Sequence, residues 1–551
     1  MFSVTQQRWT LLATILASGV VQLDGSIINV ALSSIDRDLS AGLAGLQWIV
    51  AGYALTLASF MILGGALSDR YGRKRVLMIG LLAFGISSLV CGFAVTTPLL
   101  VIARIVQGIA GALLVPGSLA ILRAVYSDEK ARASAIGTWT AFTGIAAVIG
   151  PLLGGWFVEH ATWRWVFLMN GPLIAVTIVL FVRFVPETQD ENARGALDWF
   201  GGILAVLGLT AISAALIQAP LIGLSSPLVI AGLVAGVVIL IGFVFHQART
   251  TNPMMPLSLF KSRNFSSINL ATLGIYFALG GAPFFVPLFL QNVLEQSPIV
   301  SGVVLLPMPL MLFAFAQKFG SLAAKYGSRW FIFAGAMVCV VGQVMMSQVS
   351  YSVRNVLEGL AIDAIVRYDC TKTGLQCPNT FEVIWGNVQS VYHSMSFLST
   401  SESVRLIVLA AFVIGFGLSM LVAPLTSVVL SSLPAKNAGV GTAVNYVAAK
   451  VAGLFAVAGL GLVFSSVFTA NLDAKLAQIS PDPSLKAKLE AFKANPSARA
   501  EPGLPLVRGA QTEAFKMVML VCAGLTLAGG VAVLFVRDDV LPEPDSNLTR
   551  T

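Results

Sequence analysis

Long apolar runs recur along the whole chain, and they constrain its fold more than any other feature of the sequence. A helix needs about 20 apolar residues to cross a bilayer, and fourteen runs reach that length. Lipid offers no hydrogen-bond partners to the backbone, and the runs are too long for barrel strands, so we expect every span to be helical. The sequence therefore predicts an all-α polytopic membrane protein, whose spans begin near Leu11, Trp48, Val76, Pro98, Ser134, Trp165, Trp199, Leu228, Ser266, Val300, Trp330, Arg405, Gly441 and Ala514.

The composition agrees with this prediction. Of the 551 residues, 56% are hydrophobic and only 11% are charged, whereas soluble proteins carry about 25% charged residues. The net charge of +8 is compatible with nucleic-acid binding, but the basic residues lie in short clusters between apolar runs, which is typical of membrane-protein loops. We therefore expect a lipid bilayer around the chain and no nucleic-acid partner. The first run contains an aspartate and no evident cleavage site, so we interpret it as a retained span.

The lysines and arginines predict the orientation of the spans, because cytoplasmic loops are enriched in both residues. With a cytoplasmic N-terminus, the inner loops carry basic clusters such as Arg70–Arg75 and Lys318–Arg329. The short outer loops then carry little beyond Arg37 and Arg164. We expect a multi-pass protein of the cell (inner or plasma) membrane with both termini in the cytoplasm.

Two of these inner loops resemble each other, which indicates an internal repeat. Gly65–Lys74 and Gly320–Arg329 share several identical or similar positions, although the second copy lacks the aspartate. Parallel halves of this kind are typical of transporters, with the substrate site near mid-membrane between them.

The repeat predicts two six-helix bundles separated by two extra helices. We place the N-terminal bundle at residues 1–197, the extra pair at 198–247 and the C-terminal bundle at 248–551. The last of these contains two long outer loops, at 350–403 and 470–512. Within the second loop, Ser484–Lys493 predicts a short amphipathic helix on the membrane surface.

Asp24 lies inside the first span, where an ionised carboxylate costs at least a few kcal/mol. Gln22, Ser26 and Asn29 form a polar stripe, and Asp24 points to nearly the opposite side of the helix. We infer that protein encloses this span, with the stripe facing a cavity and Asp24 facing a neighbouring helix. The alternatives are an aspartate near the outer interface and one held in structural hydrogen bonds.

Arg104 lies a few residues into the fourth span and shares a face with Gln107, Gly108 and Gly111. An arginine that points inward needs an anion or several carbonyl groups, and Asp24 is a candidate partner. The alternative is a side chain that extends to the outer surface. Gln107 is a further candidate for lining the cavity.

The fifth span contains the run Gly150-Pro151-Leu152-Leu153-Gly154-Gly155. Proline removes a backbone hydrogen bond, and Gly150 and Gly154 form a surface that a second helix can approach closely. We interpret Gly150, Pro151, Gly154 and Gly155 as a flexible packing surface at which the two halves rock. The alternative is that glycines are simply common in membrane helices.

The loop after the second span combines turn glycines with one acid and four bases. We interpret it as a cytoplasmic latch, in which Asp69 binds a helix N-terminus or a base in one conformation and releases it in the other. Simple anchoring by positive charges is the alternative. The latch residues are Gly65, Asp69, Arg70, Gly72 and Arg73.

Taken together and in order, these segments resemble the fourteen-helix drug:proton antiporter branch of the major facilitator superfamily. The resemblance implies a major facilitator fold and alternating-access export of amphipathic, often cationic compounds, with the proton gradient as the energy source and no cofactor. It assigns Asp24 and Arg104 to proton coupling, Asp69 and Arg73 to the latch, and the glycine-proline run to an antiporter hinge. The segments that carry it are Leu23–Leu32, Gly65–Lys74, Arg104–Gly108, Gly150–Gly155, Trp163–Asn170 and Ala438–Gly461.

One departure from the family pattern concerns charge. Asp24 is the one clear carboxylate deep in a span, although Glu159 lies near the outer end of the fifth span. Relatives that take divalent cations often carry a second membrane acid in the C-terminal half. Lys450 instead adds a positive charge to the thirteenth span, where many relatives have arginine, and it is a further cavity candidate. Anionic, zwitterionic and neutral substrates therefore remain open.

Other functions have less support in the sequence. A dedicated exporter of one metabolite, siderophore or lipid is the main alternative to a drug exporter, and a membrane sensor is a remote one. We expect no enzymatic activity, because the sequence has no phosphate-binding Gly-x-x-x-x-Gly-Lys-Ser/Thr loop. We expect no metal site either, because the three histidines, His160, His246 and His393, lie far apart. We expect a monomer.

We predict a disulfide between Cys370 and Cys377, because both lie in an outer segment that faces an oxidising compartment. Peptide mapping of correctly inserted, non-reduced protein is expected to recover the two cysteines in one cross-linked species. Recovery of both as free thiols would contradict the prediction.

Overall fold

The computed structural model describes residues 3–189, 198–349, 402–433, 438–478, 483–499 and 505–536, and every regular element within these ranges is a helix. Fourteen of the helical segments are long and apolar enough to cross a membrane, which confirms the predicted number of spans. Cys370 and Cys377 lie outside the described residues, as does most of the predicted outer loop 350–403.

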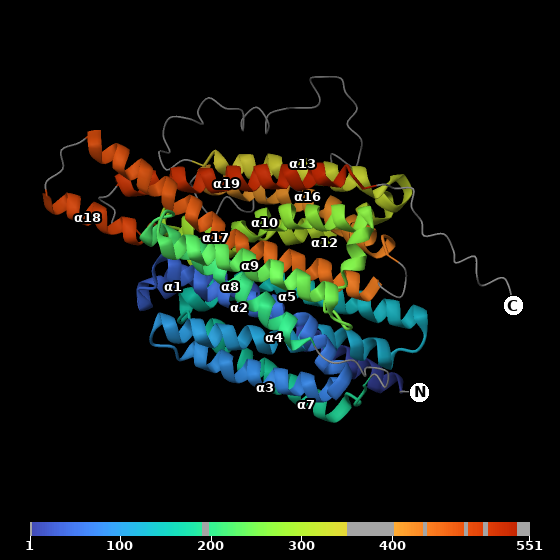
Figure 1. Ribbon diagram of the computed structural model, residues 1–551. Coiled ribbons are helices and arrows are strands. Elements are labelled where there is room, and N and C mark those ends of the chain that lie inside the picture. The colour runs from blue at the N-terminus through green and yellow to red at the C-terminus, as the bar shows by residue number, and fades with distance from the viewer. Residues whose placement is uncertain are drawn as a thin grey trace, which may run out of the picture.

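The first six spans form the lower part of the molecule in the view of Figure 1. The sixth span is interrupted at Met169, so it consists of two helices, α6 and α7. These elements are α1 (Val4–Leu39), α2 (Gly42–Tyr71), α3 (Arg73–Gly92), α4 (Thr97–Val125), α5 (Glu129–His160), α6 (Trp165–Leu168) and α7 (Asn170–Phe184).

The last six spans form the upper part, and the two extra helices lie between the halves (Figure 1). The extra helices are α8 (Trp199–Ile222) and α9 (Pro227–Arg249). The C-terminal half contains η1 (Leu257–Lys261), α10 (Arg263–Asn292), α11 (Pro298–Val304), α12 (Pro307–Tyr326), α13 (Ser328–Ser347), α16 (Glu402–Ser431), α17 (Ala438–Gln478), α18 (Pro483–Ala494) and α19 (Pro505–Val533).

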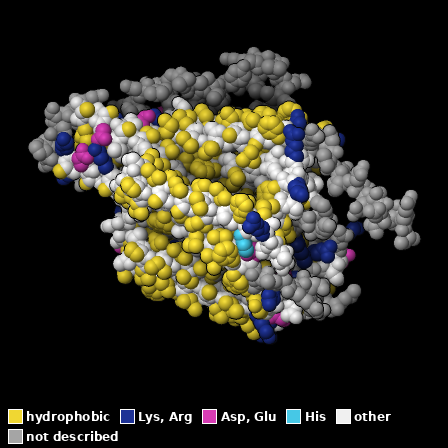
Figure 2. Space-filling view, viewed as in Figure 1, with side chains coloured by type: hydrophobic (Ala, Val, Ile, Leu, Met, Phe, Trp, Pro, Cys, Tyr) yellow, Lys and Arg dark blue, Asp and Glu magenta, His cyan; other side chains and the backbone are white. Residues whose placement is uncertain are grey.

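The helices run roughly side by side, so the bundle has two ends. We call the end with the α2–α3 and α12–α13 turns the basic end, and the opposite end the α18 end (Figure 1). Helix α1 begins and α19 finishes at the basic end. In Figure 2, hydrophobic side chains cover the middle of the visible face, and Lys and Arg side chains gather at the basic end and on α18. The assignment of the basic end to the cytoplasm stays a prediction.

The internal repeat is also a structural repeat. Gly72 separates α2 from α3 with φ 99° and ψ 124°, and Gly327 separates α12 from α13 with φ 98° and ψ 128°. Residues other than glycine rarely adopt such positive φ angles. The two glycines therefore build the same sharp turn in the two halves.

The halves are packed together near the α18 end. One core cluster combines Ile28 and Leu32 of α1 with Phe285 and Phe289 of α10. A second cluster, nearer the basic end, is built from the N-terminal half, and Tyr446 of α17 packs against it from the other half. Helix α8 bridges the halves, because its buried side chains pack against both α2 and α17. This bridging cluster contains Ala51, Leu55, Leu209, Ile217, Leu454 and Ala458.

The predicted outer loop 470–512 is wrong in its extent, because α17 continues to Gln478 and α19 begins at Pro505. No glycine or proline interrupts the chain between Gly461 and Pro481, so α17 continues beyond its apolar part. The short helix expected at Ser484–Lys493 is present as α18. Leu489 on this helix is fully buried in the core cluster, so protein, and not lipid, covers its apolar side chain.

Gly108 tests the close packing of α2 and α4. A Cβ atom at this position would overlap Thr56 Oγ1 and the carbonyl oxygen of Tyr53. We expect Gly108→Ala to lower the free energy of unfolding by about 1–3 kcal/mol, because the added methyl group has no space. The measurement is thermal unfolding of the purified chain in detergent.

Gly137→Ala on α5 is the matched control, because a Cβ atom there meets no atom within 4 Å. This variant is expected to be as stable as the wild type or slightly more stable. Equal stability of both variants would contradict the described packing of α2 on α4.

Candidate functional site

Asp24 lies in the middle of α1, and three donors from two other helices surround its carboxylate. Arg104 Nη1 forms an ion pair with Oδ2. The amide nitrogens of Gln107 and Asn170 each donate to Oδ1 at 3.0 Å. Both members of the ion pair have side chains that are 0% exposed, which excludes an Asp24 at the interface and an Arg104 that extends to the surface. The structure thus brings together the two residues predicted for proton coupling, and the coupling role itself stays a prediction.

Arg104 connects this ion pair to α2. Its Nε donates to the carbonyl oxygen of Ile49 at 3.2 Å, and Nη1 also donates to Gln107 Oε1 at 2.8 Å. The guanidinium carbon lies 4.1 Å from the centre of the Tyr53 ring, a cation–π distance. Tyr53 in turn donates its hydroxyl to the carbonyl oxygen of Val21 at 3.1 Å. The Phe167 ring lies 5.7 Å from the guanidinium carbon, so the charge of Arg104 is compensated by one carboxylate, two carbonyl-type oxygens and two aromatic rings.

Asn170 is a member of this network to which the sequence analysis assigned no role. Its amide nitrogen donates both to Asp24 and to Ser88 Oγ, at 3.0 Å each. Ser88 donates onward to the carbonyl oxygen of Phe167 at 2.9 Å. The interruption of the sixth span places Asn170 at the first position of α7. The sequence feature that could have identified Asn170 is a single amide side chain within an apolar run.

Gln107 was predicted to line a cavity, and this is wrong because its side chain is fully buried in the Asp24 network. The other predicted cavity residues differ from one another. Ser26 packs against α5, since a Cβ atom at Gly150 would overlap its hydroxyl. Gln22, Asn29 and Lys450 are half-buried.

The predicted latch forms its ion pair within a single turn. Arg73 binds Asp69 through Nη2 at 2.7 Å and through Nε at 2.9 Å. The Arg70 guanidinium lies 5.6 Å from the centre of the Tyr71 ring. Gly65 faces α4, where an added Cβ would lie 3.4 Å from Pro116. The loop is thus stabilised by an internal ion pair and packs closely against α4.

A second acid, Glu187, occupies the helix N-terminus next to this loop. Its carboxylate accepts from the backbone N–H of Lys74 at 2.9 Å and of Arg75 at 3.2 Å, in the first turn of α3. An anion at this position is stabilised by the unpaired N–H groups and by the helix dipole. Gly72 leaves room for it, because an added Cβ would lie 2.9 Å from Oε1. Asp69 was predicted to bind either a base or a helix N-terminus. In the structure Asp69 binds the base Arg73, and Glu187 binds the helix N-terminus.

The predicted hinge of α5 divides into two surfaces. Gly150 and Gly154 face α1, and an added Cβ at Gly154 would lie 2.8 Å from the carbonyl oxygen of Ile27. Gly155 faces the other half of the protein, where an added Cβ would lie 2.7 Å from the carbonyl oxygen of Pro298. Gly302 of α11 packs closely on the backbone of Pro151. The run therefore fixes α5 to its own half on one side and contacts the opposite half on the other.

Residues 494–499 form a strap across the α18 end. Asn495 Nδ2 donates to both carboxylate oxygens of Asp36 on α1, at 3.0 and 3.4 Å. Asn292 of α10 donates to the carbonyl oxygen of Ser497 at 2.7 Å. Gln511 of α19 donates to the carbonyl oxygens of two residues beside Ser497. The strap thus belongs to the C-terminal half and reaches the N-terminal half at Asp36.

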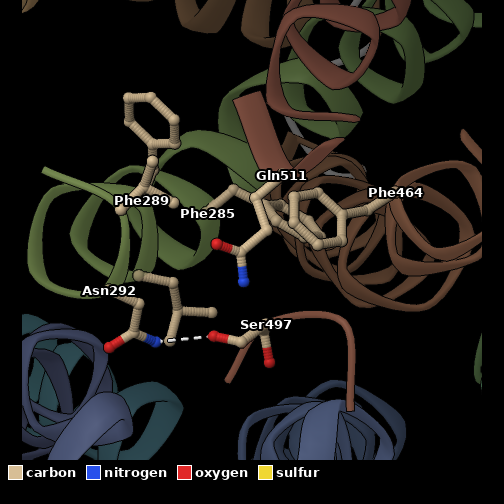
Figure 3. Close-up of a pocket in the computed structure, with 8 residues that line it drawn as sticks. Phe285, Phe289, Asn292, Phe464, Ser497 and Gln511 are labelled. Carbon is tan, nitrogen blue, oxygen red and sulfur yellow. Dashed lines mark hydrogen bonds between the residues drawn. The ribbon is translucent and has the colours of Figure 1, made fainter. Parts of the chain in front are cut away.

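A charged cluster at the base of the strap fixes it further. Glu295 lies between α10 and α11 and forms ion pairs with Arg499 and Arg508. The Arg508 hydrogen bond holds the pKa of the Glu295 carboxyl below its usual value. Next to the strap, Phe285, Phe289 and Phe464 line a small pocket together with Ser497 (Figure 3).

Comparison with known proteins agrees with this architecture. Residues 14–362 match the family model described as the Major Facilitator Superfamily. The chain is 30% identical over 495 residues to the multidrug resistance protein Stp of Mycobacterium tuberculosis (strain CDC 1551 / Oshkosh), covering 89% of this chain and 83% of that protein. It is 30% identical over 545 residues to the drug efflux pump JefA of the same strain, covering 97% of each. These two relatives are similar to the chain over most of their own length.

A solved structure supports the fold. The chain is similar, with a TM-score of 0.61 and 17% sequence identity, to a bacterial homologue of the human lysosomal transporter Spinster in an inward-facing and unoccupied conformation. The alignment covers 97% of this chain and 98% of that one.

The Asp24–Arg104 pair generates a stability prediction. Asp24→Asn leaves a buried guanidinium without its anion, so we expect a loss of about 3–5 kcal/mol in the free energy of unfolding. The double variant Asp24→Asn with Arg104→Gln removes that charge and is expected to recover part of the loss. Thermal unfolding in detergent measures both.

Asp38→Asn serves as the control. Asp38 pairs with Arg164 at 2.6 Å, but its side chain is 45% exposed, so the change is expected to be small. A double variant less stable than Asp24→Asn alone would contradict the proposed cause.

Proposed function

Because this chain belongs to the major facilitator superfamily, we propose that it is a proton-coupled antiporter that exports amphipathic, drug-like compounds by alternating access. The observation that carries the proposal is the buried ion pair of Asp24 and Arg104. A carboxylate enclosed in a membrane bundle is a group that can take up and release a proton as its solvation changes. The two relatives described above are named as resistance and efflux proteins, which supports export as the direction.

The surroundings of Asp24 explain how a proton would change the protein. All three groups that contact the carboxylate are N–H donors. They match an ionised carboxylate, which only accepts hydrogen bonds. A protonated Asp24 would lose its attraction to Arg104 and would place its own donor among donors. Protonation therefore favours a rearrangement of α1 against α4 and α7.

The contacts between the halves support alternating access. Pro151 and Gly155 of α5 meet α11 at the α18 end, and Gln291 of α10 donates to the carbonyl oxygen of Val30 on α1 at 2.9 Å. Asp36 and Asn495 extend the same contact surface. A substrate that leaves at this end requires these contacts to separate, so they belong to a state that is closed there.

The remaining assignments follow from this function. We place the protein in the plasma membrane, with the basic end and both termini in the cytoplasm and the α18 end outside. Its energy source is the proton gradient, and no cofactor is needed. Small amphipathic compounds and the lipid bilayer are its partners, and it works as a monomer without enzymatic activity.

The test uses the full chain in proteoliposomes with an imposed proton gradient. The wild type is expected to drive uphill movement of a fluorescent amphipathic cation, and an uncoupler is expected to abolish it. Asp24→Asn is expected to lose the uphill movement and to retain exchange of the dye between the two sides, because exchange needs no net proton transfer. Retained exchange also shows that the variant is folded.

Asp38→Asn is the matched control, because it removes a carboxylate from the same helix that pairs with Arg164 of its own half and lies outside the contacts between the halves. It is expected to keep uncoupler-sensitive transport. Asp24→Glu keeps a carboxylate and is expected to keep coupling. Uphill transport by Asp24→Asn, or wild-type transport that ignores the uncoupler, would overturn the proposal.

A further inference from the structure

We propose that Lys450, with Tyr446 beside it, forms a site for a negatively charged group of the transported compound. The transporter would then prefer amphipathic anions or zwitterions, which carry a carboxylate or a similar group next to a planar ring, over cations of similar shape. This inference rests on the proposed function and names its substrate class.

Lys450 lies deep within a membrane span. It follows Ala438, the first residue of α17, by 12 positions, which places it about 18 Å along the helix axis. The span itself covers Val440–Ala477. An ammonium group at this depth costs at least about 2.5 kcal/mol unless it finds a partner.

The face of α17 that carries Lys450 is turned toward the N-terminal half. Tyr446, one turn before Lys450, packs against the core cluster of that half. Two turns after Lys450, the carbonyl oxygen of Val457 accepts a hydrogen bond from Gln47 of α2. Residues four and seven positions apart share one helix face, so Lys450 lies between two contacts with the opposite half.

The space next to this face is open. A Cβ atom at Gly453, almost one turn from Lys450, would meet no atom within 4 Å. The Lys450 side chain is half-buried, and its ammonium is not one of the buried polar groups that lack a hydrogen-bond partner. The ammonium therefore lies on the face of α17 that is turned toward the N-terminal half, next to the open side of Gly453.

One aromatic ring lies next to the ammonium. The ammonium lies 5.3 Å from the centre of the Tyr446 ring, within the range of a cation–π contact. Rings of this kind offer flat surfaces on which a planar substrate can stack.

No acid within the described part of the chain pairs with Lys450. Among the described residues it forms no salt bridge, and Asp24, the acid nearest to mid-membrane, is already paired with Arg104 and bound by two amides. Of the helices that pack against α17, α2, α10 and α16 carry charged side chains only near their ends, and α8 carries none between Trp199 and Ile222. Helix α19 carries Glu513 and Lys516 farther from its start, and these two neutralise each other as an ion pair. The net charge of this region is therefore positive, which favours an anionic ligand.

The probes are two dyes that share a xanthene ring but differ in charge. Fluorescein is an anion above its pKa, and tetramethylrhodamine methyl ester is a cation. Fluorescence anisotropy measures the binding of each to the purified full chain in detergent. The wild type is expected to bind fluorescein more tightly than the rhodamine ester.

Lys450→Gln is expected to weaken fluorescein binding about tenfold, since a hydrogen bond to a charged group is lost. Its binding of the rhodamine ester is expected to stay within about twofold of the wild type or to improve. Lys450→Arg keeps the charge and is expected to keep the preference for the anion. Lys516→Gln is the matched control, because Lys516 of α19 already pairs with Glu513 at 2.9 Å, and it is expected to bind both dyes as the wild type does.

Three results would overturn the inference: unchanged fluorescein binding by Lys450→Gln, a wild-type preference for the cation, or binding of neither dye. Transport separates this inference from the proposed function. Gradient-driven export of the rhodamine ester without export of fluorescein would leave the antiporter proposal standing and overturn the anion site. A Lys450-dependent preference for fluorescein without any gradient-driven transport would leave the anion site standing and overturn the antiporter proposal.

Discussion

The ion pair of Asp24 and Arg104 is the contact on which the arrangement of the N-terminal half depends. Through direct hydrogen bonds it joins α1, α2, α4 and α7, and through Ser88 it reaches α3. In a low-dielectric interior an unpaired charge is far more costly than a lost apolar contact. The four helices must therefore keep these groups together, or rearrange as a unit when a proton removes one of the charges.

The C-terminal half meets this unit through backbone surfaces at the α18 end. Gly155 and Gly302 allow α5 and α11 to touch without intervening side chains. The same short run holds α5 against α1 through Gly150 and Gly154. A displacement of α1 next to Asp24 is thus transmitted to the helix that contacts the opposite half. The strap at Asn495 adds a polar contact over the same end.

The long apolar runs were sufficient to predict the number of spans, since the thickness of the bilayer fixes how many apolar residues each span needs. The pairing of Asp24 with Arg104 was also predictable, because each buried charge needs the other. The sequence did not predict that Asn170 binds Asp24 or that Glu187 binds the N-terminus of α3, since each contacts a residue more than a hundred positions away. Gln107 was misplaced because a helix face known to be polar can point to a cavity or to a buried ion. The division of the α5 glycines depends on two neighbouring helices, which a periodic pattern does not identify.

The charge of Lys450 has a consequence for the energy of transport. When an anion leaves the cell while a proton enters, the net result is the transfer of two positive elementary charges into the cell. Each charge gains about 2.3 kcal/mol per 100 mV of membrane potential. A neutral zwitterion gains this energy only once per proton, and a monovalent cation exchanged for one proton gains none. A transporter whose substrate site is positive at mid-membrane would thus draw on the electrical potential as well as on the pH difference, and would continue to export when the pH difference is small.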